Sequence, residues 1–162
     1  MTEKMSMRHA YGRALAELGK TNDLIVALDA DVSSSTQSQF FAKAHPDRFF
    51  NLGIAEPGMV DTAVGLAQCG KIPFVNTFAF LMALRCAEQV RSHLAYGQAN
   101  VKLAAGYAGL SDSFDGPTHH AITDLAVMRA MPGLAVIAPA DSAEMEKLLP
   151  QVHSTLSSPI FQ

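Results

Sequence analysis

Short, mostly apolar runs alternate along the chain with longer segments of helical periodicity. The runs have the length of buried strands and lie at 24–28, 49–52, 72–75, 101–105 and 134–137. The segments around them predict helices at 5–18, 37–44, 57–69, 79–96, 122–131 and 142–152. This alternation is typical of βαβ units. The sequence therefore predicts a three-layer, Rossmann-like α/β fold, in which helices flank an open and mainly parallel sheet.

Several residues mark the expected helix ends. Gly19 and Gly70 stand where a helix end favours a residue with positive φ, Pro57 stands at a helix start, and Asp141 can cap the helix that follows it. The segment 79–95 is apolar almost all round in its first two turns. We expect it to be buried, with a subunit interface as one candidate location.

The composition excludes several classes of protein. The chain carries 12 basic and 15 acidic side chains, a net charge of −3, so neither nucleic acid nor an anionic membrane is an expected partner. Two cysteines cannot build a disulfide scaffold, and no Cys/His spacing matches a zinc site. Residues 1–8 are polar, and no apolar run reaches the length of a membrane span. These features predict a soluble protein of the reducing cytoplasm.

The length of 162 residues is that of one domain, which we expect to cover 1–162. The segment 158–162 (SPIFQ) has the pattern of a further strand but lacks the turn and helix that should follow. We therefore expect the chain to be a piece of a longer polypeptide.

Polar residues follow the first two predicted strands, where an open α/β sheet binds its ligands. The loop 29–35 contains Asp31 and Ser35, and its simplest role is to cap the next helix through local hydrogen bonds. Glu56 lies beside Pro57 at a helix start, where the helix dipole favours an acidic group. The small apolar helix after it predicts that this carboxyl lies against the core.

The next two strands are followed by an aromatic segment and a long loop. Asn76 or Thr77 can cap a helix, and Phe78 is either a core residue or a ring that stacks on a heteroaromatic ligand. The loop 106–120 has no periodicity, and loops of that length are usually functional or disordered. Within it His119 is either a solvated surface residue or a group that exchanges protons near neutral pH.

Common local motifs for diphosphates, metals and serine nucleophiles are absent from the sequence. It contains no G-x-G-x-x-G, G-x-x-x-x-G-K-[ST], H-E-x-x-H or G-x-S-x-G. Three other motifs stand at strand ends: G-I-A-E-P-G-M at 53–59, N-T-F-A-F at 76–80 and D-G-P-T-H at 115–119. In order and spacing they resemble the pyrimidine-binding domain of transketolases. The resemblance extends over 8–159 and is closest to the carboxy-terminal subunit of split transketolases.

The resemblance implies a thiamine diphosphate site and ketol transfer from a ketose phosphate to an aldose. Glu56 matches the catalytic glutamate that bonds N1′ of the aminopyrimidine and so helps to activate the cofactor. Phe78 matches the aromatic residue that stacks on that ring, and Asp31 matches an acidic residue near the cofactor. Leu81 stands where many relatives have a second aromatic residue.

The resemblance also implies positions for the sugar. Arg8 and Ser35 match residues that hold a sugar phosphate, and the forked donors of an arginine suit that group. Asp115 and His119 match residues that bond the donor hydroxyls, and His119 is also a candidate catalytic residue.

Two residues depart from the family pattern. Tyr107 stands where many transketolases have a histidine near the phosphate, and Phe114 replaces a glutamate before D-G. Both changes leave the identity of the sugar open, and a substrate outside the central pentose pathway is one possibility.

The family's other domains are not among these residues, namely its carboxy-terminal domain and the domain that binds diphosphate and a divalent metal. The resemblance therefore implies a transketolase amino-terminal subunit as partner, with Mg²⁺ or Ca²⁺ bound there and none on this chain. It implies a homo-oligomer such as a dimer, and a chain that is inactive alone. Two alternatives are another thiamine enzyme, either a deoxyxylulose-phosphate synthase or a 2-oxo-acid dehydrogenase β subunit, and a non-catalytic partner subunit.

Overall fold

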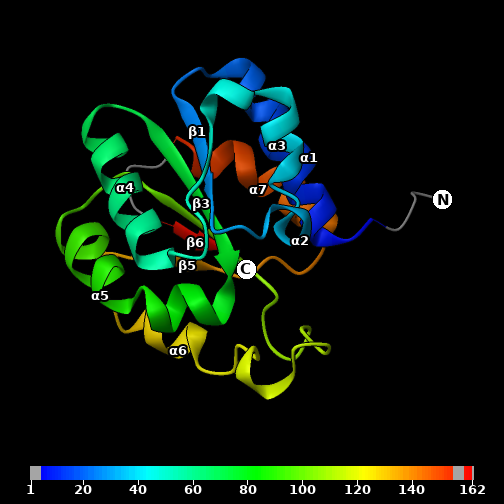
Figure 1. Cartoon of the computed structure of the whole chain (residues 1–162), viewed down its shortest axis with the longest axis vertical. Helices are drawn as coiled ribbons and strands as arrows, with labels where there is room; N and C mark the ends of the chain where they lie inside the picture. Colours follow the sequence, from blue (N-terminus) through cyan, green and yellow to red (C-terminus); the bar gives the residue numbers. More distant parts are fainter. Residues whose placement is uncertain (1–4, 155–158, 162) are drawn as a thin grey trace.

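A six-stranded parallel sheet forms the centre of the molecule in this computed structural model, which describes residues 5–154 and 159–161 (Figure 1). The strands, in the order β2-β1-β3-β4-β6-β5, are β1 (Ile25–Asp29), β2 (Phe49–Asn51), β3 (Ile72–Phe78), β4 (Lys102–Gly106), β5 (Ala135–Ile137) and β6 (Pro159–Phe161). Each strand pairs in parallel with its neighbours. The predicted α/β class and parallel sheet are confirmed.

Helices cover both faces of the sheet. They are α1 (Met7–Thr21), α2 (Ser33–Thr36), α3 (Gln39–Ala44), α4 (Glu56–Gln68), α5 (Ala87–Gln89), α6 (Asp124–Arg129) and α7 (Ser142–Val152). Two π-helical segments, η2 (Leu81–Arg85) and η3 (Val90–Tyr96), flank α5, and η1 (Pro46–Arg48) and η4 (Gly116–Thr118) are short 3-10 turns.

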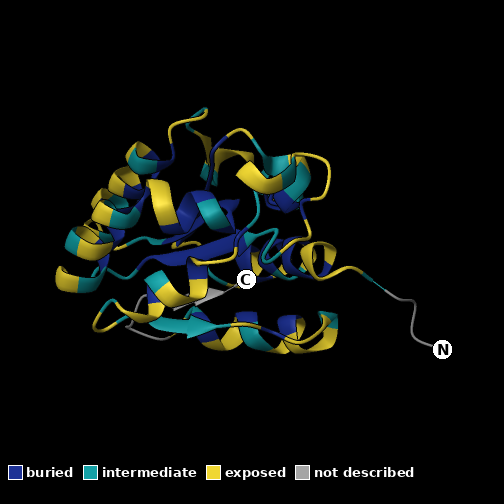
Figure 2. Ribbon diagram, turned by 90° about the horizontal axis from the view of Figure 1, so that it is seen from below, coloured by how far each residue is buried: buried dark blue, intermediate teal, exposed yellow. Residues whose placement is uncertain are grey.

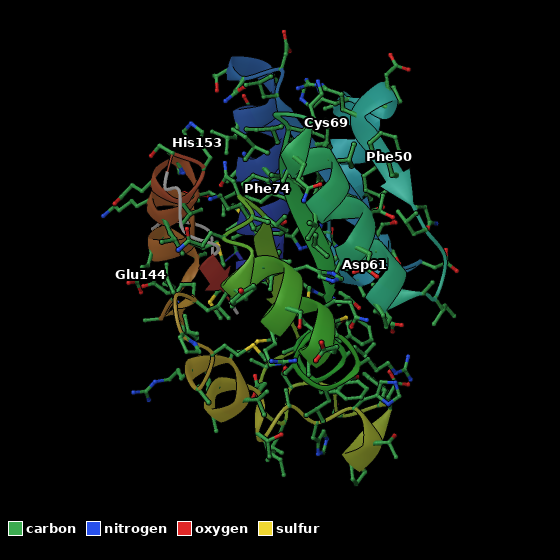
Figure 3. All side chains as sticks on the ribbon, turned by 90° about the vertical axis from the view of Figure 1, so that its left-hand side faces the viewer. Phe50, Asp61, Cys69, Phe74, Glu144 and His153 are labelled. Atoms are coloured by element: carbon green, nitrogen blue, oxygen red, sulfur yellow. The ribbon has the colours of Figure 1, made fainter. Side chains whose placement is uncertain are left out.

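Alternate strand residues build two separate cores, one on each face. Val75 packs with α4, α6 and the segment from η2 to η3, whereas its neighbour Phe74 packs with α1, α3 and α7. Figure 3 shows Phe74 in the middle of the sheet, with Asp61 of α4 and Glu144 of α7 on opposite sides of it. The buried strands lie between helices whose outer faces are exposed (Figure 2). This is the predicted three-layer arrangement.

Two predicted helix ends are confirmed and two are corrected. Gly70 has φ 83°, and the Asp141 side chain accepts the Glu144 N–H at 2.8 Å. Gly19, however, lies inside α1, which runs on to Thr21, and a Cβ there would come within 2.6 Å of Phe41. Close packing, not a positive φ, requires this glycine. Helix α4 begins at Glu56, one residue before the expected start.

The third strand is three residues longer than predicted. Asn76, Thr77 and Phe78 continue β3 because they pair with Ala104, Ala105 and Gly106 of β4. The expectation that Asn76 or Thr77 caps a helix was therefore wrong.

The segment expected as one buried helix at 79–96 is interrupted. It consists of η2, α5 and η3, and only part of its first two turns is buried: Leu84 is 54% exposed and Arg85 is exposed. The helix predicted at 37–44 begins later, at Gln39, and a separate short helix α2 precedes it, because Gln37 between them has φ 66°. The final predicted strand is present as β6, while residues 158 and 162 lie outside the described residues.

Within the described ranges, no helix combines the length and the apolar character that a membrane crossing needs.

Candidate functional site at the carboxyl edge of the sheet

The predicted site residues come from one edge of the sheet, where the strand order changes direction between β1 and β3. The strand order runs from β1 outward to β2 on one side and to β3 and β4 on the other. Asp29 pairs with Asn76, and Phe78 pairs with Gly106, so the carboxyl ends of β1, β3 and β4 meet along this edge. In open α/β sheets such a switch point is the usual place for a ligand.

Asp29 fixes the loop after β1. Its buried carboxylate accepts the Val32 N–H at 2.6 Å, the Thr36 hydroxyl at 3.0 Å and the Ser38 hydroxyl at 2.8 Å. Burial raises the pKa of Asp29, and these three hydrogen bonds oppose that rise. The loop is thereby held in a conformation that carries the two predicted residues Asp31 and Ser35.

Asp31 lies exposed at the edge of the sheet. Its backbone has φ 64°, in the left-handed region that few side chains adopt, and its Oδ1 accepts a hydrogen bond from Asn51 at 2.9 Å. Strained backbone of this kind is concentrated at functional sites. The structure keeps Asp31 at the predicted edge but pairs it with Asn51, a residue that the sequence did not single out.

Glu56 is the first residue of α4 and is 2% exposed. Its Oε1 accepts a hydrogen bond from Nη1 of Arg85, 2.8 Å away, and the Arg85 side chain is 51% exposed. The carboxyl therefore lies against the core, as predicted from the apolar helix behind it. The sequence did not predict Arg85 as the partner of Glu56. The feature that could have indicated it is that Arg85 is the single cation within the apolar run 79–86.

Aromatic rings gather beside Phe78. The Phe78 ring centroid lies 4.9 Å from that of Tyr107 and 6.3 Å from that of His119, and Phe80 lies 5.0 Å from His119. The structure thus brings two predicted site residues, Phe78 and His119, together from β3 and the long loop. Leu81 is also at this end of β3 and is 5% exposed.

Arg8 joins the first turn of α1 to this aromatic group. Its Nη1 donates to the Ser35 carbonyl at 3.4 Å and to the Tyr107 hydroxyl at 2.5 Å. The predicted pair Arg8 and Ser35 is therefore in contact, through the Ser35 backbone. Tyr107, which departs from the family pattern in the sequence, is a direct partner of Arg8.

A chain of buried hydrogen bonds joins α1, β3 and β1 beneath the same edge. The buried Tyr11 hydroxyl donates to Oδ1 of Asn76, whose Nδ2 donates to the Leu28 carbonyl at 2.8 Å. Burial is the main cause that raises the pKa of Tyr11 well above its ordinary value. This link fixes α1, which carries Arg8, against β3.

The loop after β4 carries Asp115 and His119 (Figure 1, yellow-green). Asp115 is exposed, and the Thr118 hydroxyl lies 3.0 Å from Nδ1 of His119. Phe114 is fully exposed. The structure brings His119 to Phe78 but leaves the Asp115 side chain in solvent.

Comparisons with known proteins identify the family of this chain. The family model described as the transketolase pyrimidine-binding domain matches residues 3–160. The chain belongs to this family. The predicted resemblance is therefore confirmed.

Individual relatives support the same assignment. A putative transketolase C-terminal section of Methanocaldococcus jannaschii is 47% identical over 135 residues, which cover 83% of this chain and 43% of the relative. Transketolase of Homo sapiens is 41% identical over 154 residues, which cover 94% of this chain and 24% of the human protein. The chain thus spans less than half the length of either relative.

A solved structure has the same fold. A split-gene transketolase, described as an inactive beta4 tetramer, superposes with a TM-score of 0.86 at 45% identity. The match covers 98% of this chain and 51% of that one.

Proposed function

We propose that this chain supplies the pyrimidine-binding part of a thiamine diphosphate-dependent transketolase. The assembled enzyme would transfer a two-carbon ketol unit from a ketose phosphate to an aldose. The observation that carries this proposal is the Glu56 carboxyl, buried at the start of α4 beside the carboxyl edge of a sheet of this family's fold.

The residues at this edge fit an aminopyrimidine. The ring of that cofactor has apolar faces and a polar rim, which suit a nearby aromatic ring and a buried carboxyl. Phe78 and Leu81 would flank the ring, and Asp31 would lie near it. In addition, the Thr77 hydroxyl is buried and lacks a hydrogen-bond partner among the described residues. Thr77 precedes Phe78 in β3, so this orphaned polar atom lies at the carboxyl end of the strand, where it favours a polar ligand.

Glu56 would act by holding a proton. A buried carboxyl can share a proton with a bound ring nitrogen, which is the role of a general acid–base group. When bound, thiamine diphosphate supplies an electron sink for cleavage of the bond next to the ketone. The chain itself would position the ring and move the proton at the Glu56 oxygen.

The sugar would lie across Arg8, Ser35, Asp115 and His119. Arg8 offers a guanidinium for the terminal phosphate, since its planar donors match that group. His119, beside Phe78, would bond a donor hydroxyl and could exchange a proton with it. Asp115 would reach the sugar from the exposed part of the loop.

The divalent metal would be bound elsewhere. Three or more His, Cys, Asp or Glu side chains do not come together as a metal site in the part of the chain that the structure describes. We therefore assign Mg²⁺ or Ca²⁺, with the diphosphate, to an amino-terminal transketolase subunit.

Assembly would also involve further copies of the chain in the cytoplasm. The related split-gene structure is an inactive tetramer, which supports the need for a second kind of subunit. Ile54 and Leu84 are 75% and 54% exposed and lie close in sequence to Glu56 and Arg85 respectively, so they are candidates for buried contacts in a dimer.

The test is reconstitution with the amino-terminal subunit. Ketol transfer from a ketose phosphate to an aldose would support the proposal, and carbon dioxide release from pyruvate would support a related thiamine enzyme instead. Glu56→Gln should lower kcat by about 100-fold or more, the usual loss for an acid–base group. Glu17→Gln, on the exposed face of α1, is the matched control and should keep the parental rate. Parental turnover in Glu56→Gln would refute the role of Glu56.

A further inference from the structure

Tyr107 adopts a backbone conformation that a tyrosine rarely has. It follows the last residue of β4 and has φ 58°, in the left-handed region where Cβ crowds the backbone. Such a conformation persists where surrounding contacts hold it.

The Tyr107 side chain links the Arg8 guanidinium to the Phe78 ring. Its hydroxyl accepts the hydrogen bond from Nη1 of Arg8, and the guanidinium carbon lies 5.6 Å from the centre of the tyrosine ring. The same ring is the one 4.9 Å from Phe78. Tyr107 thus lies between the proposed pyrimidine position and the cationic end of the site.

These contacts determine which donors of Arg8 are left for a ligand. Nη1 bonds the Tyr107 hydroxyl and the Ser35 carbonyl. Nε and Nη2 form the remaining edge of the guanidinium, and two parallel donors on one edge suit two oxygens of one anion. Tyr107 therefore selects a single edge of Arg8.

A cavity of about 650 Å³ has Arg8 in its wall. Arg8, Tyr11, Ser35 and Tyr107 line it, and Arg8 carries the one charge among its described lining residues. A cavity with one cation and no carboxylate in its described wall is suited to the anionic end of a ligand.

We propose that Tyr107 is a positioning and specificity residue for the terminal oxyanion of the ketose donor. It holds Arg8 so that the Nε–Nη2 edge binds a tetrahedral group, either phosphate or sulfonate. The proposal rests on the proposed function and extends it to the choice of sugar.

The test uses the reconstituted enzyme and the variant Tyr107→Phe. This variant keeps the ring beside Phe78 and Arg8 but removes the hydroxyl. KM for a ketose 6-phosphate should rise about fivefold to tenfold, as expected for a lost hydrogen bond to a charged group, with kcat nearly unchanged. KM for hydroxypyruvate, a short donor without a distal oxyanion, should stay at the parental value. Tyr96→Phe, at a tyrosine that is 90% exposed, is the matched control.

A binding measurement separates this proposal from the proposed function. Calorimetry would compare a ketose 6-phosphate, the matching 6-sulfonate and the unsubstituted ketose, without turnover. Tyr107→Phe and Arg8→Met should each weaken the two charged sugars and leave the neutral one unchanged. The charged sugar that binds more tightly to the parent identifies the oxyanion.

Two results would overturn the role of Tyr107. One is parental affinity of Tyr107→Phe for both charged sugars. The other is an equal loss for charged and neutral ligands, which would mean that the hydroxyl only supports the fold. If instead the parent binds the charged sugars through Tyr107 but transfers no ketol unit, the proposed function fails and only the role of Tyr107 in oxyanion binding stands.

Discussion

Arg85 and Glu56 form an ion pair with one buried and one exposed partner. The Glu56 side chain is 3% exposed and the Arg85 side chain is 51% exposed, with 2.8 Å between Oε1 and Nη1. The pair joins the start of α4 to the end of η2, two elements that flank the proposed cofactor edge. A buried carboxylate that loses its cation is costly, so Arg85 stabilises the position of Glu56.

Replacement of Arg85 by methionine should therefore destabilise the fold. The side chain keeps much of its length but leaves the Glu56 carboxylate without its guanidinium partner. We expect the free energy of unfolding at neutral pH to fall by about 1–3 kcal/mol, the cost of an unsatisfied buried group with some access to water. Chemical denaturation followed by circular dichroism measures this change.

Arg91→Met is the matched control for this experiment. Arg91 pairs with Glu88 on the surface, where both side chains are more than 60% exposed. Surface pairs of this kind contribute little to stability, so Arg91→Met should lose less than Arg85→Met. An equal loss in both variants would contradict the special role given to the buried carboxylate.

Gly19→Ala should destabilise the packing of α1 against α3. The new Cβ would lie 2.6 Å from the Phe41 ring and 2.7 Å from the His45 ring. Neither ring can move freely, because Phe41 is fully buried and Nε2 of His45 bonds the Ala16 carbonyl at 2.9 Å. Overpacking of this kind costs about 1–3 kcal/mol, which thermal unfolding would detect.

The opposite sign is expected for Gly65→Ala. Gly65 lies inside α4, and a Cβ there would meet no atom within 4 Å. Alanine in a helix interior is about 0.5–1 kcal/mol more favourable than glycine. A stability loss at Gly65 comparable to that at Gly19 would show that steric contact is not the cause.

Much of the fold was predictable because the signals are local. Buried parallel strands read as apolar runs, and parallel strands place their carboxyl ends at one edge, so Asp31, Glu56 and Phe78 could be assigned to that edge without coordinates. The Asp141 cap is also local, because its carboxylate bonds the N–H of Glu144, only three residues further along the chain. An acidic residue directly before a helical pattern is enough to predict it.

The rest depends on contacts between distant residues. Asn76 looked like a helix cap because its residue type favours one, but pairing with Ala104 extends β3 through it. Arg85 meets Glu56 across 29 positions, and Arg8 meets Tyr107 across 99. The sequence pattern was interpreted with the period of an α-helix, but η2 and η3 are π-helical and have more residues in each turn. The wider turn changes which residues of the segment face solvent. Leu84 is therefore exposed where the pattern predicted burial.

Asp141→Ala should weaken the start of α7. The Asp141 carboxylate accepts the Glu144 N–H at 2.8 Å in the first turn, and Oε2 of Glu144 accepts the Ala140 N–H at 2.6 Å just before the cap. Loss of the cap should cost about 1 kcal/mol. Amide exchange in the first turn of α7 should accelerate, whereas Asp141→Asn, which can still accept this bond, should restore most of the protection. Equal exchange in the alanine variant and the parent would exclude a capping role.

Lys102 should make stability depend on pH above neutrality. Its side chain is fully buried in β4, and Nζ donates to Oδ1 of Asn100 at 2.7 Å. Burial lowers the pKa of Lys102 from 10.5 to about 8. Below pH 8 the amine is protonated in both folded and unfolded chains, so it adds no pH dependence. Between pH 8 and 10.5 the unfolded chain binds more protons, and the Lys102 contribution to the free energy of unfolding rises with pH.

A difference measurement isolates this contribution. Burial also raises the pKa of Cys86 to about 12, so above pH 9 the unfolded chain loses the thiol proton first, and the falling Cys86 contribution opposes the rising Lys102 contribution. Lys102→Met keeps Cys86 and removes only the amine. The free energy of unfolding of the parent minus that of Lys102→Met should therefore rise steadily from pH 8 to about pH 10 by urea denaturation. A difference that stays constant over this range would mean that Lys102 titrates in the folded chain as it does in the unfolded one.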